Sequence, residues 1–444
     1  MYVQYCCVQI PHSDGKQHFA VLQLPLTGWI MGCCCCHFEA MSRDEHVQAE
    51  SELLDYGIRW WVSTHPAAAE VTWKSMDVPI SSKDFIHTIE YTTSIADQSS
   101  LPPLVLIHGF GFGAALYYAA APALAEKWGG RVLSLDLLGC SLSTRPTWPH
   151  RYGHRCPLET AEAYWVDAIE AWRASLGLET MVLVGHSIGG YISAAYAERH
   201  PERISRLVLA SPAGVPPPPT ALAEAQSKAP LALKLVRAAF ARGWSPFVLS
   251  KDLGMGRRML SNYMERRFGD GLPWIPKREL VSYLTGVWCR APKSAGGYMA
   301  TALLTFGGII PEGSQGEFVY ARAPLADRLL ALAKVLPRLS LIYGEFDWMF
   351  WRNAADMRRR QPSSAGELID VLRVAQATHQ LMIDNPMGFV DAVLATGSQA
   401  TANAMPIGAG FGRHYGAKAK IFERASGVKL PQDEDYITIW APGQ

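Results

Sequence analysis

The sequence predicts an α/β fold in which a mostly parallel β-sheet is covered by helices on both faces. Short apolar segments at residues 104–107, 131–135, 181–184, 207–210, 339–343 and 368–372 have the length and composition of buried strands. Segments with helical spacing lie between several of them, at residues 114–127, 159–176 and 192–199, and a last one follows Pro386. Strands that alternate with helices at these intervals are typical of a parallel sheet.

This alternation stops after residue 214. Four prolines follow at residues 216–219, and the next stretch has the pattern of helices rich in Trp, Met and Arg. A helical insertion of this kind is typical of a lid over an α/β core. We therefore expect a first part of the core at residues 76–214, a helical cap or lid at 215–325 and a second part of the core at 326–396.

The remaining residues lie outside this core. Residues 1–75 are expected to form an N-terminal extension that includes an amphipathic helix at 45–61. Within the first part of the core, in contrast, residues 85–91 alternate as a half-buried strand should. Residues 397–444 are rich in Gly and Ala and show little periodicity, so we assign this tail no role.

Composition limits the class of protein. The 444 residues are 49% hydrophobic and carry a net charge of +1, which suits a globular core with an inserted lid and does not suggest a nucleic-acid partner. Six of the 9 cysteines lie before residue 37, and Cys140, Cys156 and Cys289 are scattered. No extracellular disulfide framework is indicated, so we expect an intracellular protein.

The segment at residues 19–36 is the most apolar, yet it is interrupted by Gln23, Pro25 and Gly28 and lacks a basic leader. The four cysteines at residues 33–36 could be palmitoylated and anchor the protein, or the segment could be a poor signal anchor. We favour a third explanation, an over-extended gene model before Met41, because fold-like patterning starts there. A zinc site at Cys33 and Cys36 lacks a second ligand pair.

Residues 181–191 carry the strongest functional signal. An apolar run leads into Gly-His-Ser-Ile-Gly at residues 185–189, and a helical pattern follows. A serine on such a strand-to-helix turn is exposed as a nucleophile, and the next backbone N–H can bind a developing negative oxygen. We therefore identify Ser187 as the candidate nucleophile.

A glycine-rich loop at residues 108–113 follows an earlier strand. Its spacing differs from the dinucleotide-binding pattern, so an oxyanion loop is the better interpretation beside a serine turn. The backbone N–H groups of Phe110 and Ile188 are the expected oxyanion donors, with Gly111 as an additional candidate.

A nucleophilic serine needs an imidazole base and a carboxylate that orients it. Asp347 and His379 each follow a strand, in the chain order Ser, Asp, His that α/β-hydrolases show. Glu345 is the alternative acid. Asp136 precedes the serine and is expected to brace the turn that follows it, and two histidines next to the glycine motifs are expected to be structural, namely His108 and His186.

With these residues identified, the chain resembles subfamily 4/5 of the α/β-hydrolase domain-containing proteins. This subfamily includes lysophospholipid acyltransferase-like lipases, N-acyl phospholipid hydrolases and fungal cardiolipin-specific deacylases. The resemblance covers roughly residues 60–394. It rests on residues 108–111, 165–190, 211–215, 343–349 and 379–384.

The resemblance implies an α/β-hydrolase fold and an enzyme of acyl lipids. Some members carry asparagine at the nucleophile position and act as lipase co-activators, whereas Ser187 indicates catalysis. The family's H-x-x-x-x-D pattern, associated with acyl transfer to lysophosphatidic acid, is matched by His379 and Asp384, but we give it little weight because His379 is already the expected base. Cys140 and Ser141 depart from the usual aromatic residue and glycine, which leaves the shape of the Asp136 turn open.

Basic residues cluster within the expected lid. A solvated helical face is the favoured interpretation of such a run, and contact with a phosphate headgroup is the alternative. The cluster consists of Arg257, Arg258, Arg266, Arg267, Lys277 and Arg278.

Together these features predict a serine hydrolase of acyl lipids, either a (lyso)phospholipase or a lysophospholipid acyltransferase that forms an acyl-serine. Its apolar, aromatic lid favours a phospholipid or other acyl lipid over a small polar ester. The chemistry needs no metal or organic cofactor. We expect peripheral contact with a membrane or lipid droplet, in the cytoplasm or on a lipid-droplet or mitochondrial surface. The alternative is a non-enzymatic lipid-droplet or membrane adaptor. Hydrolysis of an epoxide or a haloalkane is disfavoured, because those chemistries place aspartate at the position of Ser187.

Overall fold

The computed structural model describes two compact units, residues 1–39 and residues 40–444. The residues that it describes are 4–11, 17–24, 41–94, 101–148, 155–220, 227, 231–241, 256–268, 272–289, 296–306, 319–349, 351–359, 369–395 and 437–439. In the first unit, β1 (Gln4–Pro11) and β2 (Gln17–Leu24) form an antiparallel hairpin. The cysteine run at residues 33–36 lies outside the described residues. Within the described part of the chain, no helix is both long and apolar enough to cross a membrane.

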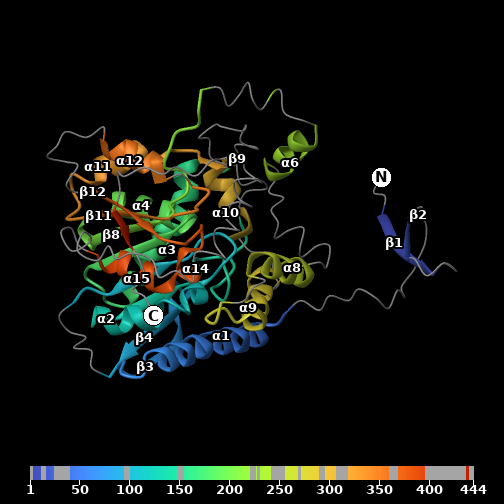
Figure 1. The fold of residues 1–444 in the computed structure, drawn as a ribbon. Coiled ribbons are helices and arrows are strands. Elements are labelled where there is room, and N and C mark those ends of the chain that lie inside the picture. Colours follow the sequence, from blue (N-terminus) through green and yellow to red (C-terminus); the bar gives the residue numbers. More distant parts are fainter. Residues whose placement is uncertain are drawn as a thin grey trace. The chain divides into compact units, whose positions relative to one another are not determined.

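Among its described residues, the second unit contains a nine-stranded sheet with the order β13-β12-β11-β8-β7-β5-β6-β4-β3, of which β3, β4, β8, β11 and β12 are labelled in Figure 1. The pairs β3–β4 and β4–β6 are antiparallel and the other pairs are parallel, so the predicted α/β class is confirmed. The strands are β3 (Val71–Pro79), β4 (Phe85–Thr93), β5 (Leu104–Ile107), β6 (Val132–Leu135), β7 (Met181–His186), β8 (Ile204–Ala210), β11 (Leu339–Gly344), β12 (Ile369–Val374) and β13 (Ile437–Ile439).

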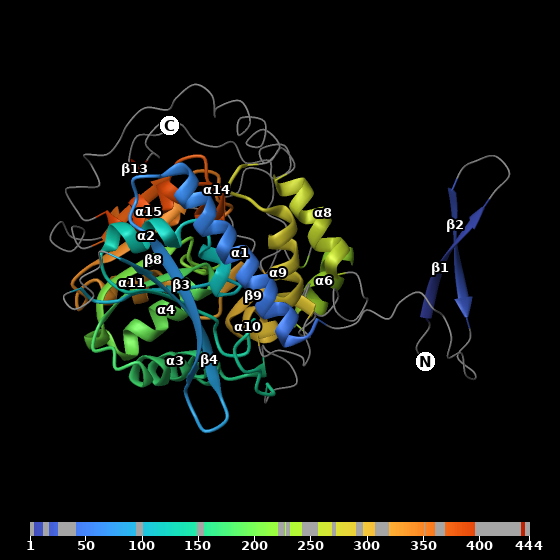
Figure 2. The same ribbon diagram turned by 90° about the horizontal axis from the view of Figure 1, so that it is seen from below.

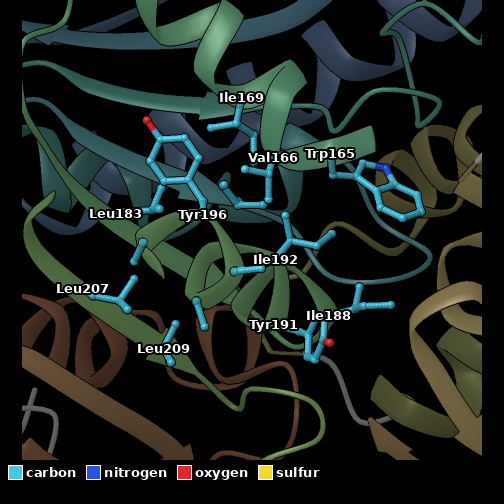
Figure 3. Packing of buried hydrophobic residues seen from close by; sticks show 14 of the residues in the cluster. Trp165, Val166, Ile169, Leu183, Ile188, Tyr191, Ile192, Tyr196, Leu207 and Leu209 are labelled. Carbon is cyan, nitrogen blue, oxygen red and sulfur yellow. The ribbon is translucent and has the colours of Figure 1, made fainter. Parts of the chain in front are cut away.

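Each face of the sheet has its own hydrophobic cluster, because successive strand residues point to opposite faces. Val105 and Ile107 of β5 join the cluster under α3 (Leu158–Ser175), α4 (Ile188–Arg199), α11 (Leu325–Leu332) and α12 (Trp351–Arg359). Leu104 and Leu106 join the other, under α1 (Arg43–Thr64), α2 (Ala121–Trp128) and α15 (Pro386–Leu394). Figure 3 shows the first cluster, in which Leu183 and Leu207 of the strands pack with α3 and α4 residues, among them Ile169 and Ile192.

Local sequence explains where several helices begin and end. Helix α1 opens with a capping box, in which the Ser42 side chain accepts from the Glu45 amide and the Glu45 carboxylate accepts from the Ser42 amide. Helix α15 has Pro386 in its first turn, and the Asn385 side chain accepts from the Gly388 amide. Helix α2 ends at Gly129, whose φ of 70° is left-handed.

Two expected boundaries change. The helix expected at 114–127 is divided into a 3₁₀ turn, η1 (Ala114–Tyr117), and α2, because Pro122 suits a first helical turn but not a helix interior. The boundary expected between residues 75 and 76 falls within β3, which the sequence analysis did not predict. Leu53, Leu54 and Trp61 of α1 are buried in the core, so residues 41–75 pack as part of the second unit.

The region expected to be a lid is largely helical where it is described. It contains α6 (Leu231–Ala241), α8 (Gly256–Phe268), α9 (Lys277–Cys289) and α10 (Gly296–Leu303), followed by β9 (Leu304–Phe306), which pairs with β10 (Val319–Ala321). We call these four helices the cap. Helix α9 packs between α1 and α8 (Figure 2), so the cap is held against the core partly by the helix that precedes the sheet.

Candidate active site

Ser187 lies where β7 gives way directly to α4. Its backbone has φ 55° and ψ −121°, a strained combination for a residue with a side chain. The small residues around it make this turn possible: a Cβ atom at Gly185 would lie 2.4 Å from the Ser193 hydroxyl and 2.6 Å from the Gly189 carbonyl oxygen. The Ser187 hydroxyl is thereby presented at the carboxyl end of the parallel strands, as the motif predicted.

The structure brings the other two predicted residues to this hydroxyl. His379 Nε2 lies 3.0 Å from Ser187 Oγ, and His379 Nδ1 lies 3.0 Å from Asp347 Oδ1. A carboxylate can only accept, so Nδ1–H donates to Asp347 and Nε2 is left to accept the serine proton. The backbone amide of Met349 also donates to Asp347 Oδ1, which fixes the carboxylate. Glu345, the alternative acid, instead accepts from the Gln376 amide.

The His379 ring is held by its neighbours. Trp348 and His186 lie against it with ring centroids 4.8 Å and 4.9 Å away. Burial, together with the nearby His379, keeps the pKa of His186 well below its usual range, so its imidazole is neutral. His186 Nε2–H donates to the His379 carbonyl oxygen over 2.8 Å. His186 therefore fixes the backbone of the neighbouring histidine, in keeping with the structural role expected for it.

The glycine loop packs directly on the serine turn. A Cβ atom at Gly109 would lie 3.0 Å from Ser187 Cβ, and one at Gly189 would lie 2.3 Å from the His108 carbonyl oxygen. Phe110 follows Gly109 in the chain, and Ile188 precedes Gly189. Both candidate oxyanion donors therefore lie beside the contact between the glycine loop and the serine turn. Gly111 has a left-handed φ of 87°, and its carbonyl oxygen accepts from Trp288 Nε1 of α9 over 2.8 Å. The cap thus helps to fix the loop that carries the candidate oxyanion donors.

His108 supports this loop from within the core. Burial lowers its pKa to about 4, so the ring is neutral. Its Nε2 accepts from the Leu137 amide over 3.0 Å, and its Nδ1–H donates to the Gly109 carbonyl oxygen over 2.8 Å. The ring therefore joins the glycine loop to the segment after β6.

Asp136 braces the following turn, as expected. Its Oδ1 accepts from the Ala114 amide over 2.6 Å, and its Oδ2 accepts from the Leu142 amide over 2.8 Å. Ser141 has a left-handed φ of 39°, which explains why a glycine is favourable at that position.

Burial, followed by the negative charge of Asp136, raises the pKa of the Cys140 thiol to about 12, so this cysteine is not a nucleophile.

A second buried cluster contains Glu50, His87 and Asp136, with one ligand-type atom from each within 4.8 Å of the others. His87 Nε2 lies 2.7 Å from Glu50 Oε1, and Nδ1 lies 2.9 Å from Asp77 Oδ1. Burial opposes the charge on His87, but Glu50 and the hydrogen bond to Asp77 outweigh it and raise the pKa to about 10. Both ring nitrogens of His87 thus face carboxylate oxygens at hydrogen-bonding distance, so among the described residues this cluster fits a buried ion network better than a metal site.

The basic residues of the cap separate into different environments. Arg257, Arg258 and Arg278 are exposed, and Lys277 pairs with the exposed Glu265. Arg267, in contrast, forms an ion pair with the buried Asp384. The expected solvated face therefore does not include Arg267, and the sequence analysis missed this contact because it joins residues 117 positions apart.

A family model described as "alpha/beta hydrolase fold" matches residues 102–245. This range includes the glycine loop, Ser187 and the start of the cap. It does not reach Asp347 or His379.

Three curated relatives are similar over longer or shorter parts of the chain. A 1-acylglycerol-3-phosphate O-acyltransferase of Arabidopsis thaliana is 28% identical over 341 residues, which cover 75% of this chain and 74% of the relative. A (lyso)-N-acylphosphatidylethanolamine lipase of Mus musculus is 29% identical over 295 residues, 65% of this chain and 77% of the relative. The human 1-acylglycerol-3-phosphate O-acyltransferase ABHD5 is 35% identical over 168 residues, 38% of this chain and 45% of the relative.

Proposed function

We propose that this chain belongs to the α/β-hydrolase family, with relatives in its subfamily 4/5, and that it is a serine hydrolase or acyltransferase of acyl lipids with Ser187 as nucleophile. The observation that carries this proposal is the continuous contact from Ser187 Oγ through His379 to Asp347, with 3.0 Å at both steps. Such a chain of contacts activates a hydroxyl that is otherwise a poor nucleophile at neutral pH.

In the first half of the reaction, Ser187 Oγ attacks the carbonyl carbon of the acyl ester or amide. His379 Nε2 takes the serine proton, and Asp347 stabilises the resulting imidazolium. The negative oxygen of the tetrahedral intermediate binds the amides of Phe110 and Ile188, with Gly111 as the additional candidate. The carbon–oxygen or carbon–nitrogen bond then breaks, and His379 returns the proton to the leaving group.

In the second half, a hydroxyl group attacks the acyl-serine ester. His379 removes its proton and afterwards protonates Ser187 Oγ. Water as the attacking group gives a lipase, and a lysophospholipid hydroxyl gives an acyltransferase. The same three residues serve both outcomes, so the acceptor is decided by what enters the site and not by different chemistry.

The lipid assignment rests on the relatives and on the cap. The relatives' names refer to 1-acylglycerol-3-phosphate and to (lyso)-N-acylphosphatidylethanolamine, which are both acyl glycerophospholipids. The sequences of cap helices α6 and α9 contain many large apolar residues, and long acyl chains need such surface. We extend the proposal to a lid at residues 215–325 between a first part of the core that ends at residue 214 and a second part at 326–396, and to peripheral contact with an intracellular membrane or lipid droplet.

The test is labelling of the purified full chain with a fluorophosphonate probe, followed by peptide mapping. We expect one adduct, on Ser187, because the probe reacts with serines activated by a histidine. Incubation with labelled phospholipids, with and without lysophosphatidic acid and acyl-CoA, then identifies donor and acceptor. An intact protein without an adduct and without turnover would instead support the non-enzymatic adaptor.

Gly189→Ala tests the oxyanion arrangement. The new Cβ atom would lie 2.3 Å from the His108 carbonyl oxygen and 2.9 Å from that of Ile107, so the glycine loop must move away from Ser187. We expect kcat to fall about a hundredfold, as for loss of an oxyanion donor. Gly177→Ala is the matched control, since its Cβ meets no atom within 4 Å. This control should lower stability slightly because φ is 65°, but leave kcat unchanged. Equal kcat in both variants would contradict the assignment.

A further inference from the structure

Arg267 of cap helix α8 reaches the loop that carries His379. Its Nη2 atom donates to Thr378 Oγ1 over 2.5 Å and to the carboxylate of Asp384. The Asp384 side chain is fully buried and that of Arg267 is 16% exposed. An ion pair with this burial is not a solvated surface contact, because removal of either partner leaves a charge without water.

Asp384 in turn fixes the residue before His379. Its Oδ2 atom accepts from the Thr378 amide over 2.8 Å and from the Thr378 hydroxyl over 2.6 Å. On the other side, the His379 carbonyl oxygen accepts from His186. The backbone around His379 is therefore held at two points: the Thr378 amide, through Asp384, and the His379 carbonyl, through His186.

The surrounding contacts keep Arg267 and Asp384 together. The Trp274 indole donates to the carbonyl oxygen of Ile383 over 2.7 Å, and the Tyr118 hydroxyl donates to the Trp274 carbonyl oxygen. The Arg267 guanidinium also lies over the Phe268 ring, 4.6 Å from its centroid. The last two residues of α14 (Leu381–Asp384) are thus connected to the cap region at two points, Asp384 to Arg267 of α8 and Ile383 to Trp274 between α8 and α9.

From these contacts we infer that Arg267 is a positioning residue, which couples the cap to His379 through Asp384 and Thr378. This inference deepens the proposed function and rests on it for its kinetic consequences. It assigns Asp384 to the placement of His379 and not to a separate acyl-transfer step. Both Asp384 oxygens are engaged by Arg267, and Oδ2 also by Thr378, so the carboxylate already has a structural task.

Amide hydrogen exchange of the ligand-free protein tests the positioning itself. In Arg267→Met, the peptide that contains residues 377–384 should exchange faster than in the wild type, because Asp384 loses its counter-charge and releases the Thr378 amide. Arg267→Lys should exchange nearly as the wild type does, since the contacts to Thr378 and Asp384 come from the single Nη2 atom and lysine keeps the positive charge. Unchanged exchange of this peptide in Arg267→Met would overturn the inference, whether or not the protein proves to be an enzyme.

Kinetics give a second, independent measurement. We expect Arg267→Met to lower kcat up to about a hundredfold with little change in KM, because a misplacement of about 1 Å has that effect on a catalytic group. Arg267→Lys should recover most of the rate. A rise in KM at unchanged kcat would instead indicate that Arg267 binds the substrate headgroup, and it would overturn the positioning role.

Glu265→Gln is the matched control. It removes a charge from the same helix, where Glu265 is exposed and pairs with Lys277. Its exchange and kcat should equal those of the wild type, and a change as large as that of Arg267→Met would show a general effect of α8 and overturn the inference. Should Arg267→Met fail to fold, Arg267→Gln gives the same comparison with a polar side chain. Absence of all turnover in the wild type would remove the proposed function but leave the exchange result decisive for the inference.

Discussion

Replacement of Ser187 by alanine is expected to lower kcat about a millionfold, the loss that follows removal of a nucleophilic serine from an intact triad. The His379 imidazole would then have no hydroxyl to deprotonate, and no acyl-enzyme could form. Alanine suits the same turn, since the neighbouring glycines still provide the space, so the fold should be preserved. Release of fatty acid from a labelled phospholipid measures the effect, and thermal unfolding verifies the fold.

Ser175→Ala is the appropriate control for this experiment. The Ser175 hydroxyl, in the last residue of α3, donates to the Pro79 carbonyl oxygen at the surface, and its removal should leave kcat unchanged. If Ser187→Ala kept its turnover and its fluorophosphonate adduct, another residue would be the nucleophile. The triad assignment would then be wrong even though the geometry is suitable.

The sequence predicted the candidate triad because each member follows a recognisable strand. Ser187 follows β7, Asp347 follows β11 and His379 follows β12, and the carboxyl ends of parallel strands meet at one edge of a sheet. Local patterns and chain order were therefore enough to bring together residues 192 positions apart, and the structure places them in hydrogen-bonding distance. Their catalytic roles remain predictions that the experiments above test.

Strand β3 and the ion pair between Arg267 and Asp384, which the sequence analysis did not predict, have no such local pattern. Strand β3 lies at the sheet edge with mixed burial, so its residues do not alternate between apolar and polar as a half-buried strand does. Arg267 is one of several basic residues in the cap, and nothing nearby in the sequence distinguishes it from the exposed Arg258. Asp384 can be recognised as the partner of Arg267 only once the packing of α8 against the core is known. The spacing of apolar residues in the sequence indicates secondary structure, but it does not show which distant charged residues will form a pair in the folded protein.

The network around His87 shows the energetic weight of such a missed contact. We expect His87→Leu to lower the free energy of unfolding by about 3–5 kcal/mol, the usual cost of removing one partner of a buried charge pair. Glu50 and Asp136 are 1% and 0% exposed, so neither carboxylate could turn to water for compensation. Burial, with Glu50 beside it, already raises the pKa of Asp136 to about 6, and the His87 charge opposes that rise. Urea unfolding at pH 6 measures the loss, with His200→Leu, at the surface end of α4, as a control expected to change little.

The pH dependence separates this network from simple packing. The pKa of His87 is about 10 in the folded protein and ordinarily 6.5, so its proton stabilises the fold fully below pH 6.5, and that contribution is lost as the pH rises through 10. The difference in unfolding free energy between wild type and His87→Leu should therefore shrink from pH 6.5 to pH 10. Glu50→Gln should lower the free energy of unfolding less in the His87→Leu background than in the wild type. In that background the substitution removes a buried charge that has already lost its partner. A difference that is constant with pH, together with additive effects of the two substitutions, would show that His87 contributes only its volume.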